Sequence, residues 1–148
     1  MFERYTKKAR RVIYFARLEA SGYGSHHIET EHILLGLMRE SPALLKRALG
    51  PEADEAQIRA EIEKSIEMGE RFSTAIEVPL TEESKKVLVR AANEADALGH
   101  RPIGSAHLLL SLLSFRRSRA ARILAARGVK LQSLRERLAS EMTNIEEQ

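Results

Sequence analysis

The chain of 148 residues contains no cysteine and no tryptophan, and aromatic residues make up only 5% of it. The absence of cysteine excludes disulfides, thiolate metal sites and cysteine nucleophiles, and it fits a reducing compartment. No apolar run approaches the roughly 20 residues that span a bilayer. The opening residues, MFERYTKKARR, also lack the apolar stretch of a signal peptide. We therefore expect a soluble, cytoplasmic protein without a membrane segment.

The sequence also lacks a phosphate-binding loop of the GxxxxGKS/T type, and it is too short for an ATP-driven motor or a TIM barrel. No Ser-His-Asp order stands out among its residues. The five histidines include the neighbours His26 and His27, but the second half of the chain has no matching pair. We therefore expect no catalytic site, no metal site and no cofactor, which leaves a binding or structural role.

Charge is abundant but unevenly distributed. The formal net charge is +3, and arginine (17 residues) outnumbers lysine (7 residues). Basic residues concentrate in Met1–Gly22 and Phe115–Arg137, whereas acidic residues concentrate in Glu52–Glu70. Such runs are typical of solvated helix faces, and they also fit an anionic partner. Nucleic acid is one such partner, but no aromatic residues interleave with the arginines to stack on bases.

An internal repeat is the strongest feature of the sequence. When Thr6–Met38 is set above Thr81–Leu113, a shift of 75 residues without gaps, 11 of 33 positions are identical. The identities include Glu19/Glu94 and His32/His107. Two copies with so long a period predict one pseudo-symmetric domain and not an open solenoid.

Each copy is predicted to form four helices. Thr6 and Thr30 cap the first two, Pro42 starts the third, which ends at Leu49, and a fourth carries Ile58, Ile62 and Ile66 on one face. In the second copy, Thr81 and Ser105 are the caps, and the last two helices span Ser118–Ala126 and Lys130–Met142. The sequence thus predicts an all-α, eight-helix, pseudo-twofold domain, with repeat one at about 2–68, a linker at 69–80 and repeat two at 81–143.

The repeated acidic and histidine residues are interpreted as structural. Glu19 and Glu94 lie on the first helix of each copy, and His32 and His107 lie just inside the second. A hydrogen bond from each histidine to the glutamate of its own repeat would satisfy both groups. We therefore expect the pairs Glu19–His32 and Glu94–His107 to hold the fold together.

Four segments together resemble a known family: FERYTKKARRVI at the start, GYGSHHIETEHILLGLM, its copy ALGHRPIGSAHLLLSLL, and the linker that precedes PLTEESKKVL. They resemble the N-terminal domain of ClpA/ClpC-type unfoldases, a double Clp repeat, and the resemblance runs from Phe2 to about Met142. It implies two four-helix Clp repeats. It also implies that the domain docks adaptor proteins and substrates for ATP-driven unfolding and proteolysis by Clp ATPase and protease subunits.

The resemblance also implies a ligand. In ClpC-type domains the glutamate of the TEH motif, here Glu31, helps to bind phosphorylated arginine, with the phosphate at helix N-termini such as those of Thr6, Thr30, Thr81 and Ser105. The second copy reads GSAH, so Ala106 replaces that glutamate. We therefore expect at most one competent site, near Glu31. The alternative is that Glu31 is a first-turn acid that stabilises its helix.

These features predict a non-enzymatic protein-interaction module that is a monomer on its own. The alternative, from a different class, is a nucleic-acid-associated regulatory protein that uses the arginine-rich second repeat. The chain begins with Met1 and ends in a polar tail, so we favour a stand-alone protein over a fragment of a larger unfoldase.

Overall fold

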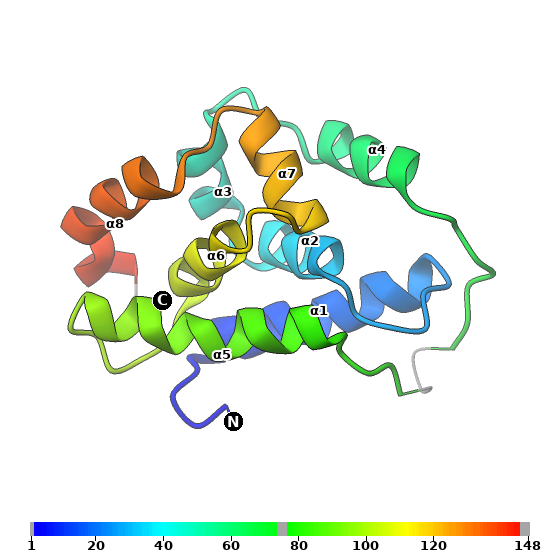
Figure 1. Cartoon of the computed structure of the whole chain (residues 1–148), viewed down its shortest axis with the longest axis horizontal. Helices are drawn as coiled ribbons and strands as arrows, with labels where there is room; N and C mark the ends of the chain where they lie inside the picture. The colour runs from blue at the N-terminus through cyan, green and yellow to red at the C-terminus, as the bar shows by residue number, and fades with distance from the viewer. Residues whose placement is uncertain (1, 74–76, 146–148) are drawn as a thin grey trace.

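The computed structural model describes residues 2–73 and 77–145, and this part of the chain forms eight α-helices and no β-strand (Figure 1). The predicted all-α fold with two four-helix repeats is therefore confirmed. The first repeat contains α1 (Lys7–Gly22), α2 (Thr30–Glu40), α3 (Pro42–Leu49) and α4 (Glu55–Ser65). The second contains α5 (Glu82–Ala97), α6 (Ser105–Ser114), α7 (Arg119–Ala126) and α8 (Leu131–Ile145).

The first helix of each repeat begins as the sequence predicts. Thr6 Oγ1 accepts a hydrogen bond from the backbone N–H of Ala9 at 3.1 Å, and Thr81 Oγ1 accepts one from Ser84 at 3.1 Å. Each hydroxyl satisfies a backbone donor that the first turn of the helix leaves free. α3 begins at Pro42, whose missing N–H costs nothing at this position.

The second helix of each repeat begins differently from the prediction. Thr30 and Ser105 are the first helical residues of α2 and α6, not their caps. The capping bond comes from the third helical residue, because His32 Nδ1 accepts from the N–H of Glu29 at 2.9 Å and His107 Nδ1 accepts from Gly104 at 2.9 Å. This is the backward half of a capping box, with imidazole in place of the usual glutamate or glutamine.

Two further helix boundaries differ from the sequence-based expectation. Ile66 lies one residue beyond α4 and is half-buried, so the apolar face of that helix rests on Ile58 and Ile62. α8 continues to Ile145 rather than ending at Met142. The expected fraying from Asn144 onward falls partly on residues 146–148, which lie outside the described residues.

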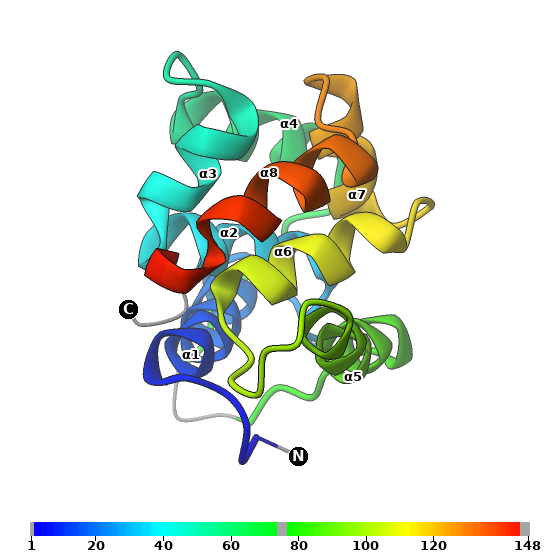
Figure 2. The ribbon, with the colours of Figure 1, turned by 90° about the vertical axis from the view of Figure 1, so that its left-hand side faces the viewer.

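α2 and α6 form the centre of the molecule. Figures 1 and 2 show α1 and α5 along one side, with α3, α4, α7 and α8 on the opposite side. All residues of Thr30–Met38 and Ser105–Leu113 are buried, as expected of helices covered on every side. Gly36 lets α2 approach α1, because a Cβ there would lie 2.3 Å from the Val12 carbonyl oxygen.

The repeats interlock through two short parallel bridges, Tyr5–Ile103 and Ile28–Leu80. The two bridges are equivalent under the 75-residue shift. In each, the residue two positions before the first helix of one repeat pairs with the loop that leads into the second helix of the other. The start of α1 therefore lies beside the start of α6, and the start of α5 lies beside the start of α2. No helix among the described residues has the length and apolar character needed to cross a membrane.

Candidate functional site

Two surface depressions lie where the repeats meet. The first seam site, of about 280 Å³, lies at the starts of α1, α3 and α6, and it is lined by Thr6, Lys8, Glu40, Ser41, Pro42, Ala43, Leu44, Arg47, Gly104 and Ser105. The second seam site, of about 180 Å³, lies at the starts of α5, α7 and α2, and it is lined by Glu29, Thr30, Glu31, Glu83, Arg117, Ser118, Arg119 and Arg122. Most lining residues of one site are the 75-residue counterparts of those of the other.

The Glu31 carboxylate in the second seam site already has a partner from the same chain. Arg119 on α7 donates from Nη1 to Glu31 Oε2 at 2.7 Å, across 88 positions of sequence. Glu31 is only 2% exposed, whereas the Arg119 side chain keeps 37% of its surface exposed. A guanidinium thus occupies the place at which the resemblance puts the guanidinium of a ligand. Thr30 Oγ1 accepts from the N–H of Ala120 at 3.4 Å and helps to hold α7 there.

The first seam site has no carboxylate at the equivalent position, because Ala106 is buried there. Ser41 Oγ donates to Ser105 Oγ at 2.9 Å across this seam. Arg47 Nη1 forms an ion pair with Glu141 on α8 at 3.1 Å, so its positive charge already has a partner within the chain. Among the expected phosphoarginine residues, the structure therefore places Thr6 and Ser105 in this site and Thr30 and Glu31 in the other.

Thr81 does not line either seam site. Its Oγ1 caps α5 and also donates to Ser84 Oγ at 2.9 Å, while Glu83, two residues on, lines the second site. Its expected role as a phosphate ligand stays a prediction, and the observed role is that of a helix cap.

The expected glutamate–histidine pairs are wrong. Glu19 instead receives a bidentate pair from Arg59 on α4, with Nη1 at 2.7 Å and Nη2 at 3.2 Å from its two oxygens. Glu94 receives the equivalent pair from Arg135 on α8, at 2.9 and 3.1 Å. Both acids are more than nine-tenths buried. The repeated glutamates therefore tie the fourth helix of each repeat to the first, while the histidines cap α2 and α6.

Burial keeps both repeated histidines neutral. It lowers the pKa of His32, and it lowers that of His107 to about 4, with smaller electrostatic contributions from the neighbouring His100 and Arg4 side chains. Burial also raises the pKa of Glu29, which lies near the negative charge of Glu31. Both imidazoles accept from backbone N–H groups, so the observed role of each ring is that of a helix cap.

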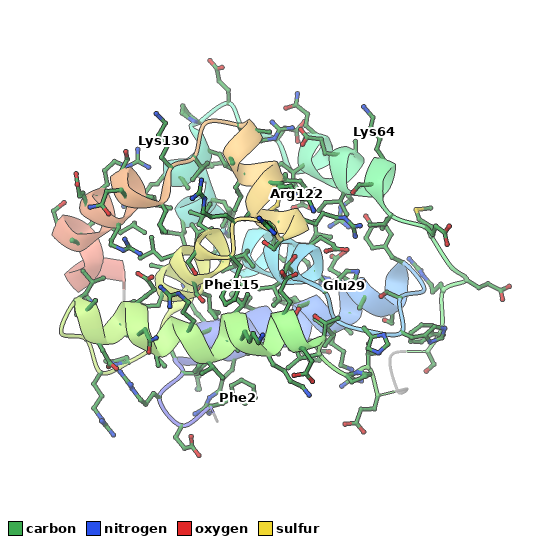
Figure 3. The ribbon with its side chains drawn as sticks, viewed as in Figure 1. Phe2, Glu29, Lys64, Phe115, Arg122 and Lys130 are labelled. Carbon is green, nitrogen blue, oxygen red and sulfur yellow. The ribbon has the colours of Figure 1, made fainter. Side chains whose placement is uncertain are left out.

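Three arginines at the α6–α7 connection, Arg116, Arg117 and Arg122, form what we call the arginine ridge. All three are exposed, and no carboxylate in the described ranges forms an ion pair with them. Arg122 Nε donates to the backbone carbonyl of Arg117 at 3.0 Å, which holds the Arg122 side chain at the rim of the second seam site. Figure 3 shows Arg122 on α7 above Glu29 at the start of α2.

The sequence analysis placed Arg117 and Arg119 in the basic run Phe115–Arg137 but not in the candidate phosphoarginine site. Their counterparts in the first repeat are Pro42 and Leu44, so the 75-residue comparison carries the signal: both positions are uncharged in the first copy and basic in the second. No group of three or more potential metal-binding side chains occurs within residues 2–73 and 77–145.

A family model described as the Clp repeat N-terminal domain matches residues 4–118 and, a second time, residues 79–148. The chain belongs to the Clp repeat N-terminal domain family. The double match agrees with the internal repeat and with the two interlocked halves of the fold.

Relatives of the chain are subunits of Clp ATPases. It is 43% identical over 138 residues to an ATP-dependent Clp protease ATP-binding subunit ClpA homolog of Cyanidium caldarium, and 42% identical over 138 residues to the chloroplastic chaperone protein ClpC1 of Oryza sativa subsp. japonica. Each alignment covers 91% of this chain but only 16% and 15% of the relative. The chain thus spans about one sixth of the length of these relatives or less, and it corresponds to their N-terminal region.

Solved structures of N-terminal domains of other chaperones share the fold. The N-terminal domain of the chaperone ClpD from Arabidopsis thaliana superposes with a TM-score of 0.75 at 24% identity, covering 97% of each chain. The Hsp104 N-terminal domain from Candida albicans gives a TM-score of 0.69 at 17% identity, covering 95% of this chain and 92% of that one. At these identities the likeness establishes the eight-helix architecture.

Proposed function

We propose that the chain is a non-enzymatic docking module that presents adaptors or protein substrates to an ATP-dependent Clp unfoldase or protease. The observation that carries this proposal is membership of the Clp repeat family along nearly the whole chain. The relatives are named as ATP-binding subunits or chaperones, and this chain corresponds to about one sixth of their length or less. A domain without the motor acts on the same substrates only by binding them or by binding the motor.

The arginine ridge supports an anionic partner for the module. Guanidinium groups that form no ion pair within the chain are available to a partner, and they pair well with carboxylates. Because no aromatic side chains interleave with the ridge to stack on bases, an acidic protein segment fits better than nucleic acid.

Phosphoarginine binding remains a separate hypothesis for this chain. Glu31 is the sole acid expected to receive the ligand guanidinium, and its Oε2 is bonded to Arg119. A phosphorylated arginine would have to displace Arg119 from that position. We therefore expect weak binding that rises when Arg119 is removed, and no binding at the first seam site, where Ala106 stands.

The docking proposal is tested by affinity capture from the native cytosol with the whole chain as bait. Recovery of a Clp ATPase, a Clp protease or one of their adaptors supports it, and recovery of nucleic acid alone supports the alternative. A gel-shift assay in low salt measures nucleic-acid binding directly, and we expect no retardation.

The ridge is tested with a triple charge reversal, in which Arg116, Arg117 and Arg122 become glutamate. A matched control reverses three other exposed cations, Lys64, Arg71 and Lys130. Both variants lower the net charge by six, so a general electrostatic effect appears in both. We expect only the ridge variant to lose the captured Clp partner. Equal loss in both variants, or no loss in either, contradicts docking at the ridge.

A further inference from the structure

His32 carries a buried hydrogen-bond donor without a partner. Its Nδ1 accepts from the Glu29 N–H at 2.9 Å, so the proton of the neutral ring is on Nε2. The residue is only 1% exposed, and Nε2 has no hydrogen-bond partner. A buried, unsatisfied N–H is costly, and such groups are rare in native proteins unless a ligand or water completes them.

The second repeat shows how the same donor can be satisfied. His107 also accepts on Nδ1 from the N–H three residues before it, and its Nε2 lies 3.3 Å from Nδ1 of His100. The counterpart of His100 in the first repeat is Ser25, which lacks the reach and donates its hydroxyl to the His27 carbonyl at 2.7 Å. The orphaned donor is therefore specific to the first repeat.

His32 lines a cavity together with Ser25, the first-repeat counterpart of His100. The cavity has a volume of about 330 Å³, and its other lining residues are Tyr23, Glu29, Glu31, Ser65, Ile66, Glu67 and Arg119. Glu31 is neutralised by Arg119, but no cation is paired with Glu29 or Glu67 in the described part of the chain. The cavity thus presents one N–H donor at a buried position and two carboxylates with free acceptor capacity.

From this arrangement we propose that the His32 cavity binds an amide group of a neutral or basic polypeptide segment. The amide oxygen accepts the hydrogen bond of His32 Nε2–H, and N–H groups or a nearby cation of the same segment donate to Glu29 and Glu67. The proposal rests on the proposed docking function and names a second surface for it, of opposite charge preference to the arginine ridge.

Other ligand classes fit the site less well. A metal ion would need a lone pair on Nε2, but the hydrogen bond from the Glu29 N–H occupies the lone pair on Nδ1 and leaves the proton on Nε2. A carboxylate or phosphate could accept the hydrogen bond of His32, but the negative charges of Glu29 and Glu67 would repel it. An amide has both an acceptor and donors, and it carries no charge that the acids would repel.

The experiment uses the whole 15N-labelled chain and long-range 1H–15N spectra of the imidazole rings. The probe is the capped peptide acetyl-Gly-Lys-Gly-amide. The matched control is acetyl-Gly-Glu-Gly-amide, whose central side chain carries the opposite charge. We expect the lysyl peptide to shift the His32 Nε2 signal saturably, and the glutamyl peptide to bind about tenfold more weakly. The absence of any saturable shift, with the ring bonded to water only, overturns the proposal.

The decisive variant is Ser25→His, which copies the second repeat. The loops superpose in their bonding, since the N–H of Ser25 bonds to the Ala20 carbonyl at 2.8 Å and that of His100 bonds to the Ala95 carbonyl at 2.9 Å. We expect a folded protein whose new imidazole satisfies His32 and fills the cavity, with peptide affinity reduced at least about tenfold. Undiminished affinity in Ser25→His overturns the proposal.

A second variant, Glu67→Gln, changes an exposed residue and leaves the fold intact. We expect it to remove most of the preference for the lysyl over the glutamyl peptide, and an unchanged preference contradicts the assigned role of Glu67. Capture of the Clp partner separates the two proposals: if capture persists while the peptide fails to bind, only the His32 cavity is refuted. If the peptide binds while capture fails, only the docking function is refuted.

Discussion

The Glu31–Arg119 pair offers the sharpest test of how the seam is held together. The change is Arg119→Leu, which copies its first-repeat counterpart, Leu44. It leaves Glu31, only 2% exposed, without its 2.7 Å partner. Removing one member of a buried ion pair costs about 3–5 kcal/mol. Since the Arg119 side chain is 37% exposed and its charge is screened by water, we expect a smaller loss of about 2 kcal/mol.

The matched variant is the double substitution Glu31→Ala/Arg119→Leu, which copies the Ala106/Leu44 combination of the first seam site. It removes both charges, so no buried carboxylate is left unpaired. We expect its free energy of unfolding to lie within about 1 kcal/mol of the wild type, because replacing both partners of such a pair by apolar groups is often neutral.

The assay is urea denaturation at pH 7, with a thermal scan beside it. For a domain of this size a loss of about 2 kcal/mol lowers Tm by roughly 4–8 °C. Equal stabilities of Arg119→Leu and the wild type would refute the reasoning that the pair closes the seam. So would a double variant as unstable as the single one, since the unpaired charge of Glu31 would then not be the cause.

The remaining predictions concern the core and the histidine caps. Gly36→Ala places a Cβ 2.3 Å from the Val12 carbonyl oxygen, so we expect a loss of about 3 kcal/mol or more in urea denaturation, whereas Gly22→Ala, with nothing within 4 Å, changes stability by less than about 1 kcal/mol. Equal effects would contradict the close contact of α1 with α2. Burial lowers the pKa values of His32 and His107 in the folded chain, to about 4 for His107. Below the ordinary histidine pKa, these two residues therefore bind more protons in the unfolded chain than in the folded one. The free energy of unfolding should therefore fall as the pH drops from about 6.5 toward 4, and replacing His107 by glutamine should flatten that slope. If His107→Gln left the pH dependence of the free energy of unfolding unchanged, the burial of His107 would not be its cause.

Phosphoarginine binding provides a test of the ligand that the family resemblance implies. Calorimetry with free phosphoarginine should show weak binding to the wild type and tighter binding to Arg119→Leu, because that variant frees the Glu31 carboxylate. Adding Glu31→Ala should abolish the gain. Affinity that does not change when Glu31 is replaced would remove the hypothesis.

Local rules predicted most helix boundaries correctly but failed at α2 and α6. Thr30 and Ser105 are favoured cap residues, and a rule based on residue type selects them. The structure places the cap one residue earlier, because His32 and His107 reach back to the N–H groups of Glu29 and Gly104. An imidazole at the third helical position is not part of the usual capping pattern, so local sequence preferences gave no reason to expect it.

The candidate site was only half predictable from the sequence, for a different reason. Glu31 was singled out by the family resemblance, but its partner is 88 residues away and meets it because the packed fold sets the start of α2 beside the start of α7, where Ala120 also bonds to Thr30. Likewise, Glu19 pairs with Arg59, whereas the 75-residue counterpart of Arg59 is Leu134. Pairings between segments distant in sequence depend on the packed fold, and identical repeat positions do not identify them.

The contrast between core positions and seam positions explains how one pseudo-twofold fold can have two seam sites of different charge. The buried positions Ile33–Met38 and Leu108–Leu113 carry no charge in either repeat, since a charge there would have to be buried. Seam positions such as Pro42/Arg117 and Lys8/Glu83 border solvent, so exchanging their charge costs the fold little. The same freedom applies to Ser25, where one residue decides whether a buried histidine is satisfied from within. Differences between the repeats at the seam are therefore the best guide to the partners of this chain, and the variants that restore symmetry, Ser25→His and Arg119→Leu, test them most directly.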